Sequence, residues 1–113
     1  MTTAPQIPSH IRFMMAAVQD RALDLGLTGH TGARAELDIG ADYAVFELVT
    51  RPGHIEGSRQ KRQRITAQLE CVLGMQDHTP LDEAMAEARQ QMAAMLDHLN
   101  TLIDQAAAEE VPA

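Results

Sequence analysis

The longest unbroken pattern in the sequence lies in its last third, where apolar residues recur every three or four positions. Thr79 and Pro80 precede this run as a helix cap and a favourable first helical residue. Asp82 and Glu83 place negative charge at the positive end of the helix dipole. The pattern therefore predicts one long amphipathic helix over residues 80–106. Its apolar positions are Leu81, Met85, Ala88, Met92, Met95, Leu99, Leu102 and Ala106.

At 1.5 Å per residue this helix would be about 40 Å long, which is more than a compact domain of 113 residues requires. Its apolar positions alternate between spacings of four and three residues, as in a coiled-coil seam. We therefore expect the stripe to form a homodimer face or a partner helix face. The alternative is that the stripe only covers the chain's own sheet. The expected contact residues are Leu81, Met85, Met92, Met95, Leu99 and Leu102.

A second, shorter helix is predicted near the N-terminus. Its period of three and four residues follows Ser9, a helix cap, and ends at Leu25, where Gly26 supplies a stop. Residues 1–8 are expected to form a flexible arm, and residues 107–113 a disordered tail.

The middle of the chain changes to a period of two, which is typical of β-strands. Apolar and polar residues alternate from Ala33 to Ile39 and again from Tyr43 to Val49, and the short break between them indicates an antiparallel hairpin. The run 64–73 fits either a strand or a helix. We interpret it as a third strand, because a hairpin alone is only marginally stable. The sequence thus predicts one α+β domain over 9–106, in the order α-β-β-β-α, with an antiparallel three-stranded sheet packed by both helices.

Charge narrows the classes of function. The net charge of −7 opposes non-specific binding to nucleic acid or to anionic membranes. The segment from residue 51 to residue 64 is the exception, because Glu56 is its only acid. We expect this segment to be an anion-binding or partner-binding loop. Its basic residues are Arg51, Arg59, Lys61, Arg62 and Arg64.

The residues that usually carry catalysis or bind metals are sparse. Cys71 is the single cysteine, so we expect a buried, reduced thiol and a cytoplasmic location. The histidines have neither the spacing of a metal pair nor a cysteine pair beside them, and no metal or cofactor is expected. No serine, threonine or cysteine stands with an evident base, so we expect no catalytic residues and no enzymatic activity. No apolar stretch reaches the roughly 20 residues that a membrane helix needs.

These observations favour a non-enzymatic, acidic protein-interaction or accessory protein that acts as a homodimer. The arginine-rich and alanine-rich composition is a hint of a bacterial or phage source. One form of this hypothesis is an inhibitor that occupies the nucleic-acid site of a host defence complex, because carboxylates on a rigid scaffold can stand in for phosphates. The first alternative is a nucleic-acid-binding dimer that uses the basic loop 51–64. The second is a small acidic secretion-type chaperone.

Overall fold

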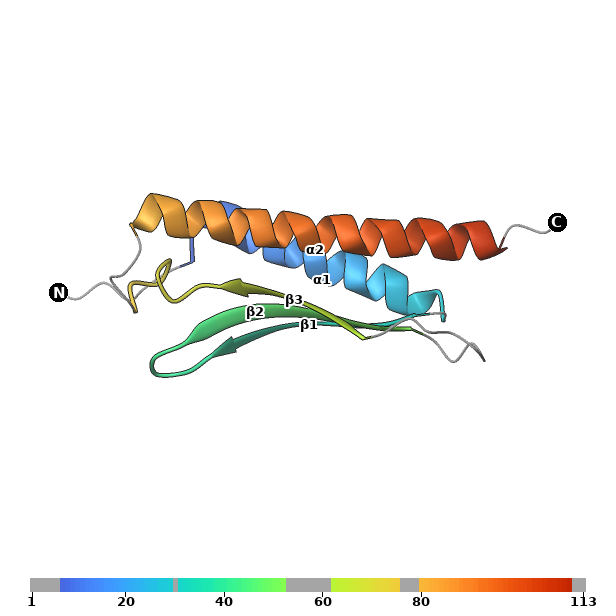
Figure 1. Ribbon diagram of the computed structural model, residues 1–113, viewed down its shortest axis with the longest axis horizontal. Helices are drawn as coiled ribbons and strands as arrows, with labels where there is room; N and C mark the ends of the chain where they lie inside the picture. Colours follow the sequence, from blue (N-terminus) through green and yellow to red (C-terminus); the bar gives the residue numbers. More distant parts are fainter. Residues whose placement is uncertain (1–6, 30, 53–61, 76–79, 111–113) are drawn as a thin grey trace.

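The order of helices and strands is the one that the sequence predicts, α-β-β-β-α in the α+β class. The computed structural model describes residues 7–29, 31–52, 62–75 and 80–110. The three strands form one antiparallel sheet in the order β1-β2-β3, and both helices pack on the same face of it (Figure 1). The elements are α1 (Ser9–Leu27), β1 (Thr31–Ile39), β2 (Ala44–Pro52), β3 (Gln63–Gln68) and α2 (Leu81–Glu110).

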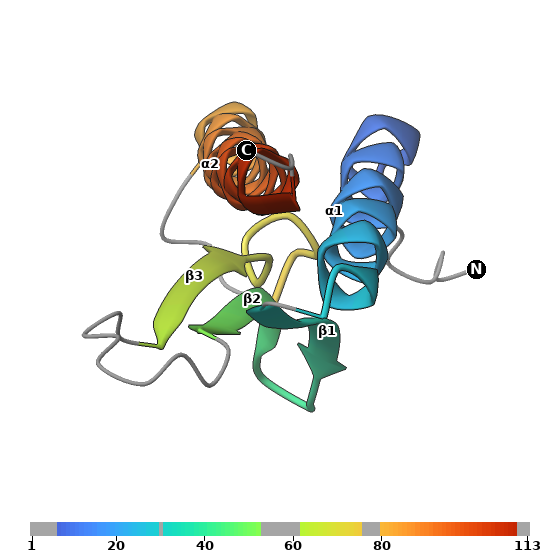
Figure 2. The ribbon, with the colours of Figure 1, turned by 90° about the vertical axis from the view of Figure 1, so that its right-hand side faces the viewer.

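The core forms where the two helices meet the central strand. α1 lies over β1, α2 lies over β3, and the helices contact each other above β2 (Figure 2). Phe46 and Leu48 of β2 are fully buried beneath this helix pair. Burying apolar side chains of two helices against one sheet face is the main stabilising contribution in a two-layer domain of this kind. The helical residues of the core include Ile11, Val18, Leu25, Met92, Met95 and Leu99.

α1 ends at Leu27, two residues after the predicted end at Leu25. Gly26 lies inside the helix and does not stop it. The stop comes from the next residues, where the Thr28 hydroxyl donates to the Leu25 carbonyl at 2.6 Å and Gly29 has φ +79°. A left-handed residue at this position is easily adopted by glycine and ends a helix.

The apolar stripe of α2 packs largely against the core of its own chain. Met92, Met95 and Leu99 are each 0% exposed, whereas Leu81 in the same stripe is 54% exposed. Met85 and Leu102 are half-buried. The alternative that the stripe covers its own sheet therefore accounts for its central residues. The homodimer stays a prediction, but Met92, Met95 and Leu99 are not available to a second copy.

The ambiguous run 64–73 contains a strand and then a turn. β3 ends at Gln68, and the N–H of Leu69 still donates to the Ala44 carbonyl at 2.8 Å. The N–H of Leu73 then donates to the Leu69 carbonyl at 2.9 Å, a helical spacing, before Gly74 with φ +72°. The prediction of a strand is confirmed to Gln68 and is wrong for residues 70–73. The alternating period of the sequence belongs to the strand, and the helical period belongs to the turn that follows it.

Both ends of the domain differ from the expectation. α2 continues to Glu110, so the predicted disordered tail is wrong for residues 107–110, where alanine and glutamate favour a helix. Ile7 packs against the core, so the predicted flexible arm is wrong at that residue. The rest of both predictions, residues 1–6 and 111–113, lies outside the described residues.

Candidate anion-binding face

The face of the sheet opposite the helices carries most of the charged residues of the strands. Side chains alternate between the two faces of a strand, and the apolar set of each strand faces the helices. The remaining set forms the surface termed the open face here. It consists of Gly32, Arg34, Glu36, Asp38, Val45, Glu47, Val49, Arg51, Arg64, Thr66 and Gln68.

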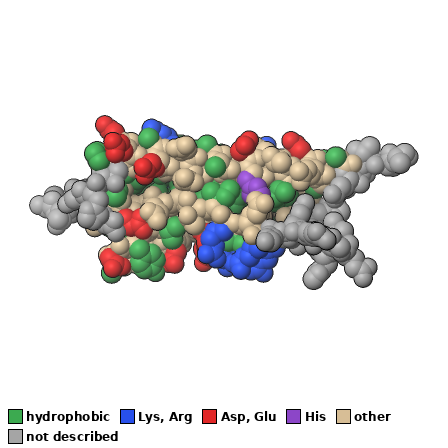
Figure 3. Space-filling model, viewed as in Figure 1, with side chains coloured by type: hydrophobic (Ala, Val, Ile, Leu, Met, Phe, Trp, Pro, Cys, Tyr) green, Lys and Arg blue, Asp and Glu red, His purple; other side chains and the backbone are tan. Residues whose placement is uncertain are grey.

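The open face is divided between a basic and an acidic end. In the register of the sheet, Val49 pairs with Arg34 on one side and with Arg64 on the other, and Arg51 pairs with Gly32. Glu36 and Asp38 lie on β1 toward the β1-β2 hairpin. Figure 3 shows basic side chains gathered along the underside of the sheet and acidic ones toward the hairpin end. A chain with a net charge of −7 therefore presents a local concentration of positive charge.

One carboxylate orders two of the arginines. Glu47 Oε1 lies 2.6 Å from Arg64 Nε, and Glu47 Oε2 lies 3.8 Å from Arg34 Nη2. Arg34 Nε also lies 3.6 Å from Glu36 Oε2. The two arginines are more than half exposed and Glu47 is 22% exposed, and ion pairs so open to solvent contribute little to stability. Arg51 forms no ion pair with any described residue, so the basic end keeps an excess of positive charge.

A hollow of about 240 Å³ lies between two of the arginines. Its lining residues are Gly32, Ala33, Arg34, Val49 and Arg51. Gly32 contributes no side chain opposite Arg51, and Val49 is only 1% exposed. A guanidinium group presents paired N–H donors that match two oxygens of a phosphate or carboxylate. The hollow thus offers an anion two arginines beside an apolar side chain.

The predicted basic loop is only partly a loop. Arg51 lies in β2, Arg64 lies in β3, and Arg62 is exposed directly before β3. Arg59 and Lys61 lie outside the described residues. The three-stranded pairing adds a residue that the sequence analysis did not include, Arg34 of β1. The alternation of β1 was a signal for it, since Arg34 stands between the inward-facing Ala33 and Ala35.

The hairpin end carries a single polar contact between side chains. The hydroxyl of Tyr43 donates to Asp38 Oδ1 at 3.3 Å. The negative charge of Asp38, and then this hydrogen bond, raise the pKa of Tyr43 above its usual value of 10.0. Gly40 permits the arrangement, because a Cβ at that position would overlap the Tyr43 ring.

A second polar contact joins α2 to the inner face of the sheet. His98 Nε2 lies 2.9 Å from the hydroxyl of Thr50 on β2. Thr50 is buried, and partial burial of His98 lowers its pKa below the usual 6.5. Because partial burial favours the uncharged imidazole, the hydrogen bond between Thr50 and His98 joins two neutral groups at the edge of the core.

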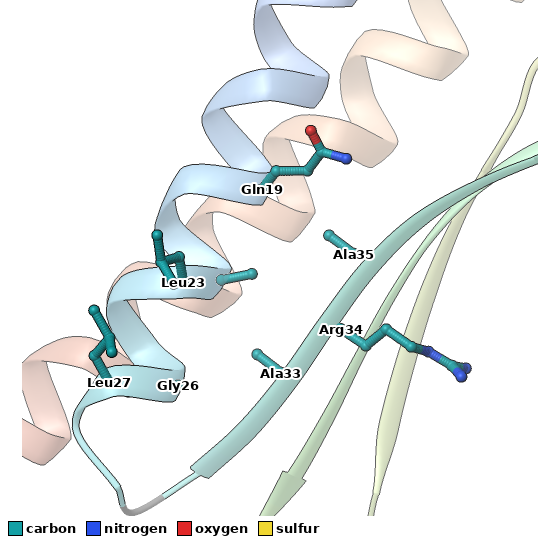
Figure 4. Close-up of a pocket in the computed structure, with 8 residues that line it drawn as sticks. Gln19, Leu23, Gly26, Leu27, Ala33, Arg34 and Ala35 are labelled. Carbon is teal, nitrogen blue, oxygen red and sulfur yellow. The ribbon is translucent and has the colours of Figure 1, made fainter.

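A groove of about 370 Å³ separates α1 from β1. Figure 4 shows Ala33 and Ala35 pointing from β1 toward the helix, while Arg34 points to the opposite side of the strand. Leu23 and Leu27 border the groove on α1 and are 59% and 75% exposed. The two leucines and the half-buried alanines of β1 make this groove a candidate contact surface.

The remaining candidates for chemistry are weak. Cys71 is half-buried in the turn after β3, so the prediction of a buried thiol on a strand is wrong. Within residues 7–29, 31–52, 62–75 and 80–110, no three His, Cys, Asp or Glu side chains are grouped as metal ligands. Neither of the two described helices is apolar enough over a sufficient length to cross a membrane.

No protein family model, curated protein or solved structure matches this chain.

Proposed function

We propose that this protein is a non-enzymatic binding protein that holds the phosphate backbone of nucleic acid on the basic end of its open face. One observation carries the proposal: Arg34, Arg51 and Arg64 share one end of one sheet face, and two of them line a hollow. Phosphate groups accept paired hydrogen bonds from guanidinium groups, and the release of counterions adds to the affinity. None of the three aromatic residues of the chain lies among these arginines, so the contact is to phosphates and not by stacking on bases.

The acidic charge elsewhere does not cancel this site at physiological salt. Arg34 and Asp38 are four residues apart on β1, which is about 13 Å in a strand. The Debye length at physiological ionic strength is about 8 Å, so Asp38 is largely screened from an anion at the hollow. Two carboxylates lie closer: Glu47 pairs with Arg34 and Arg64, and Glu36 pairs with Arg34. Three arginines stand against these two carboxylates at the basic end. The local field therefore favours an anion although the whole chain is acidic.

The test is binding of fluorescently labelled single-stranded and duplex oligonucleotides, measured by anisotropy between about 50 and 200 mM salt. The proposal predicts affinity that falls steeply with salt. Replacing Arg51 and Arg64 by alanine should abolish most of the binding and reduce the salt slope on duplex DNA by about two. The matched control replaces Arg12 and Arg89 by alanine, which removes the same charge from exposed positions on the helices. Equal losses in both double variants, or no binding at the lowest salt, would contradict the proposal.

A protein partner is the second candidate, because the groove between α1 and β1 exposes Leu23 and Leu27. Its natural test is capture of a partner by the wild-type protein and not by a variant with serine at both leucines. The inhibitor and secretion-type chaperone hypotheses stay predictions, since the described surface favours neither over a general protein contact.

A further inference from the structure

β1 is an edge strand whose inner face is incompletely covered. The inward residues of β2 are fully buried, whereas those of β1 are half-buried, and Ile39 is exposed. Leu23 and Leu27 expose apolar surface beside the same strand. Among the described residues, no strand pairs with the outer edge of β1. A long strand with an open edge and an apolar border is a template for pairing with another strand.

The hydrogen bonds of the hairpin show which residues of β1 direct their backbone N–H and C=O groups to the open edge. The N–H of Gly40 donates to the Tyr43 carbonyl at 2.9 Å, one pair beyond Ile39 and Ala44. Hydrogen-bonded and non-hydrogen-bonded pairs alternate along an antiparallel ladder. The even-numbered residues of β1 therefore direct their N–H and C=O groups to β2. The odd-numbered residues from Thr31 to Ile39 direct theirs to the open edge.

When a second copy of β1 lies antiparallel to the first and both are centred on Ala35, opposite charges face each other. β1 has nine residues from Thr31 to Ile39, and Ala35 is its centre. In an antiparallel pair centred there, Arg34 lies opposite Glu36 of the second copy and Glu36 lies opposite Arg34. Moving the centre by one residue places Arg34 opposite Arg34, or Glu36 opposite Glu36. Opposite charges across strands stabilise a pair and like charges destabilise it, so one register is favoured.

We propose that two copies of this chain join edge to edge through β1, centred on Ala35, into one continuous six-stranded antiparallel sheet. The two-fold axis runs through the sheet at Ala35, so both open faces lie on one side and both α1 helices on the other. Arg34 exchanges its exposed contact with Glu36 of its own chain for Glu36 of the second copy. Leu23 lines the groove together with Ala35, so in this arrangement it lies near the second copy.

The same register brings Asp38 of the second copy opposite Gly32, where the missing side chain leaves the hollow lined by Arg34 and Arg51. The Asp38 carboxylate of the second copy and a phosphate group would therefore compete for Arg34 and Arg51. Dimer formation is therefore measured without nucleic acid, and the nucleic-acid binding tests on the wild-type chain are repeated in the Ala35→Pro background. The edge-to-edge dimer does not depend on the proposed function, and either can fail without the other.

The experiment is sedimentation equilibrium of the full chain over a wide concentration range, with four variants. The wild-type mass should rise from that of one 12.3 kDa chain to twice that value. Ala35→Pro should remain monomeric, because it removes the N–H at the axis but no hydrogen bond to β2. Arg34→Glu should raise the dissociation constant by at least about tenfold. The exchange Arg34→Glu with Glu36→Arg should restore the dimer, and Arg89→Glu on α2 is the matched charge control.

Circular dichroism and thermal unfolding show which variants remain folded. A wild-type protein that stays at the mass of one chain throughout overturns the proposal. So does a dimer that Ala35→Pro and Arg34→Glu, both folded, leave intact. Rescue by the charge exchange is the result that a general loss of stability cannot produce.

Discussion

Replacing Leu99 by alanine tests how the long apolar stripe is used. Leu99 of α2 is 0% exposed in the core, while Leu81 in the same stripe is 54% exposed. Truncating a buried leucine removes its transfer free energy and leaves a cavity, at a cost of about 2–5 kcal/mol. The same change at an exposed position is usually within about 0.5 kcal/mol. Leu99→Ala should therefore destabilise the fold by several kcal/mol and Leu81→Ala hardly at all.

The assay is urea unfolding followed by far-ultraviolet circular dichroism. With a slope of about 1–3 kcal/mol per molar urea, a loss of about 3 kcal/mol lowers the midpoint by roughly 1–3 M. The difference between Leu99→Ala and wild type should not change with protein concentration, because the side chain is covered by its own chain. Equal, small effects of the two substitutions would show that the core does not depend on Leu99. A difference that shrinks on dilution would instead place Leu99 in a seam between copies, because dilution dissociates such a dimer.

Three further predictions concern single charged groups. Asp38→Asn should lower the pKa of Tyr43 toward 10.0, because the Asp38 charge is the largest cause of its shift; Tyr43 is the only tyrosine, so its ultraviolet absorbance reports the titration directly, and an unchanged pKa would contradict the contact. Burial lowers the pKa of His98 in the folded chain below the 6.5 of the unfolded chain, so below pH 6.5 the unfolded state binds more protons and stability decreases as the pH falls. His98→Gln should flatten that part of the stability profile in unfolding measured from pH 7.5 downward, and an unchanged profile would refute the assignment. Glu47→Gln should tighten oligonucleotide binding, because it removes the one carboxylate that faces Arg34 and Arg64; weaker binding in the anisotropy assay would show that ordering these arginines matters more than the charge.

The fold was predictable because periodicity and breakers act locally. The change from a helical period to alternation at Ala33 and the unbroken run before Ala106 placed four of the five elements. The run 64–73 was harder, since its two periods belong to a strand and to the turn that follows it. Where β3 stops depends on Ala44 and Leu69 meeting across the sheet, which a single segment does not reveal.

The candidate site was predictable only in part. The excess of arginine between Arg51 and Arg64 is visible in the sequence, but Arg34 joins it only through the register of β1 with β2. The spacing of the apolar stripe of α2 likewise could not show whether its residues pack against a second copy or within one chain. A seam between copies and a core within one chain require the same apolar period, and the packing of α1 beside α2 decides between them for Leu99.

The proposed site of nucleic acid is the basic end of the open face. Its most direct test is amide chemical-shift mapping of the isotopically labelled protein as an oligonucleotide is added at low salt. We expect the shifts to concentrate at Arg34, Val49, Arg51 and Arg64, with little change along the exposed side of α2. Shifts confined to the helices, or no shifts at low salt, would contradict this proposal.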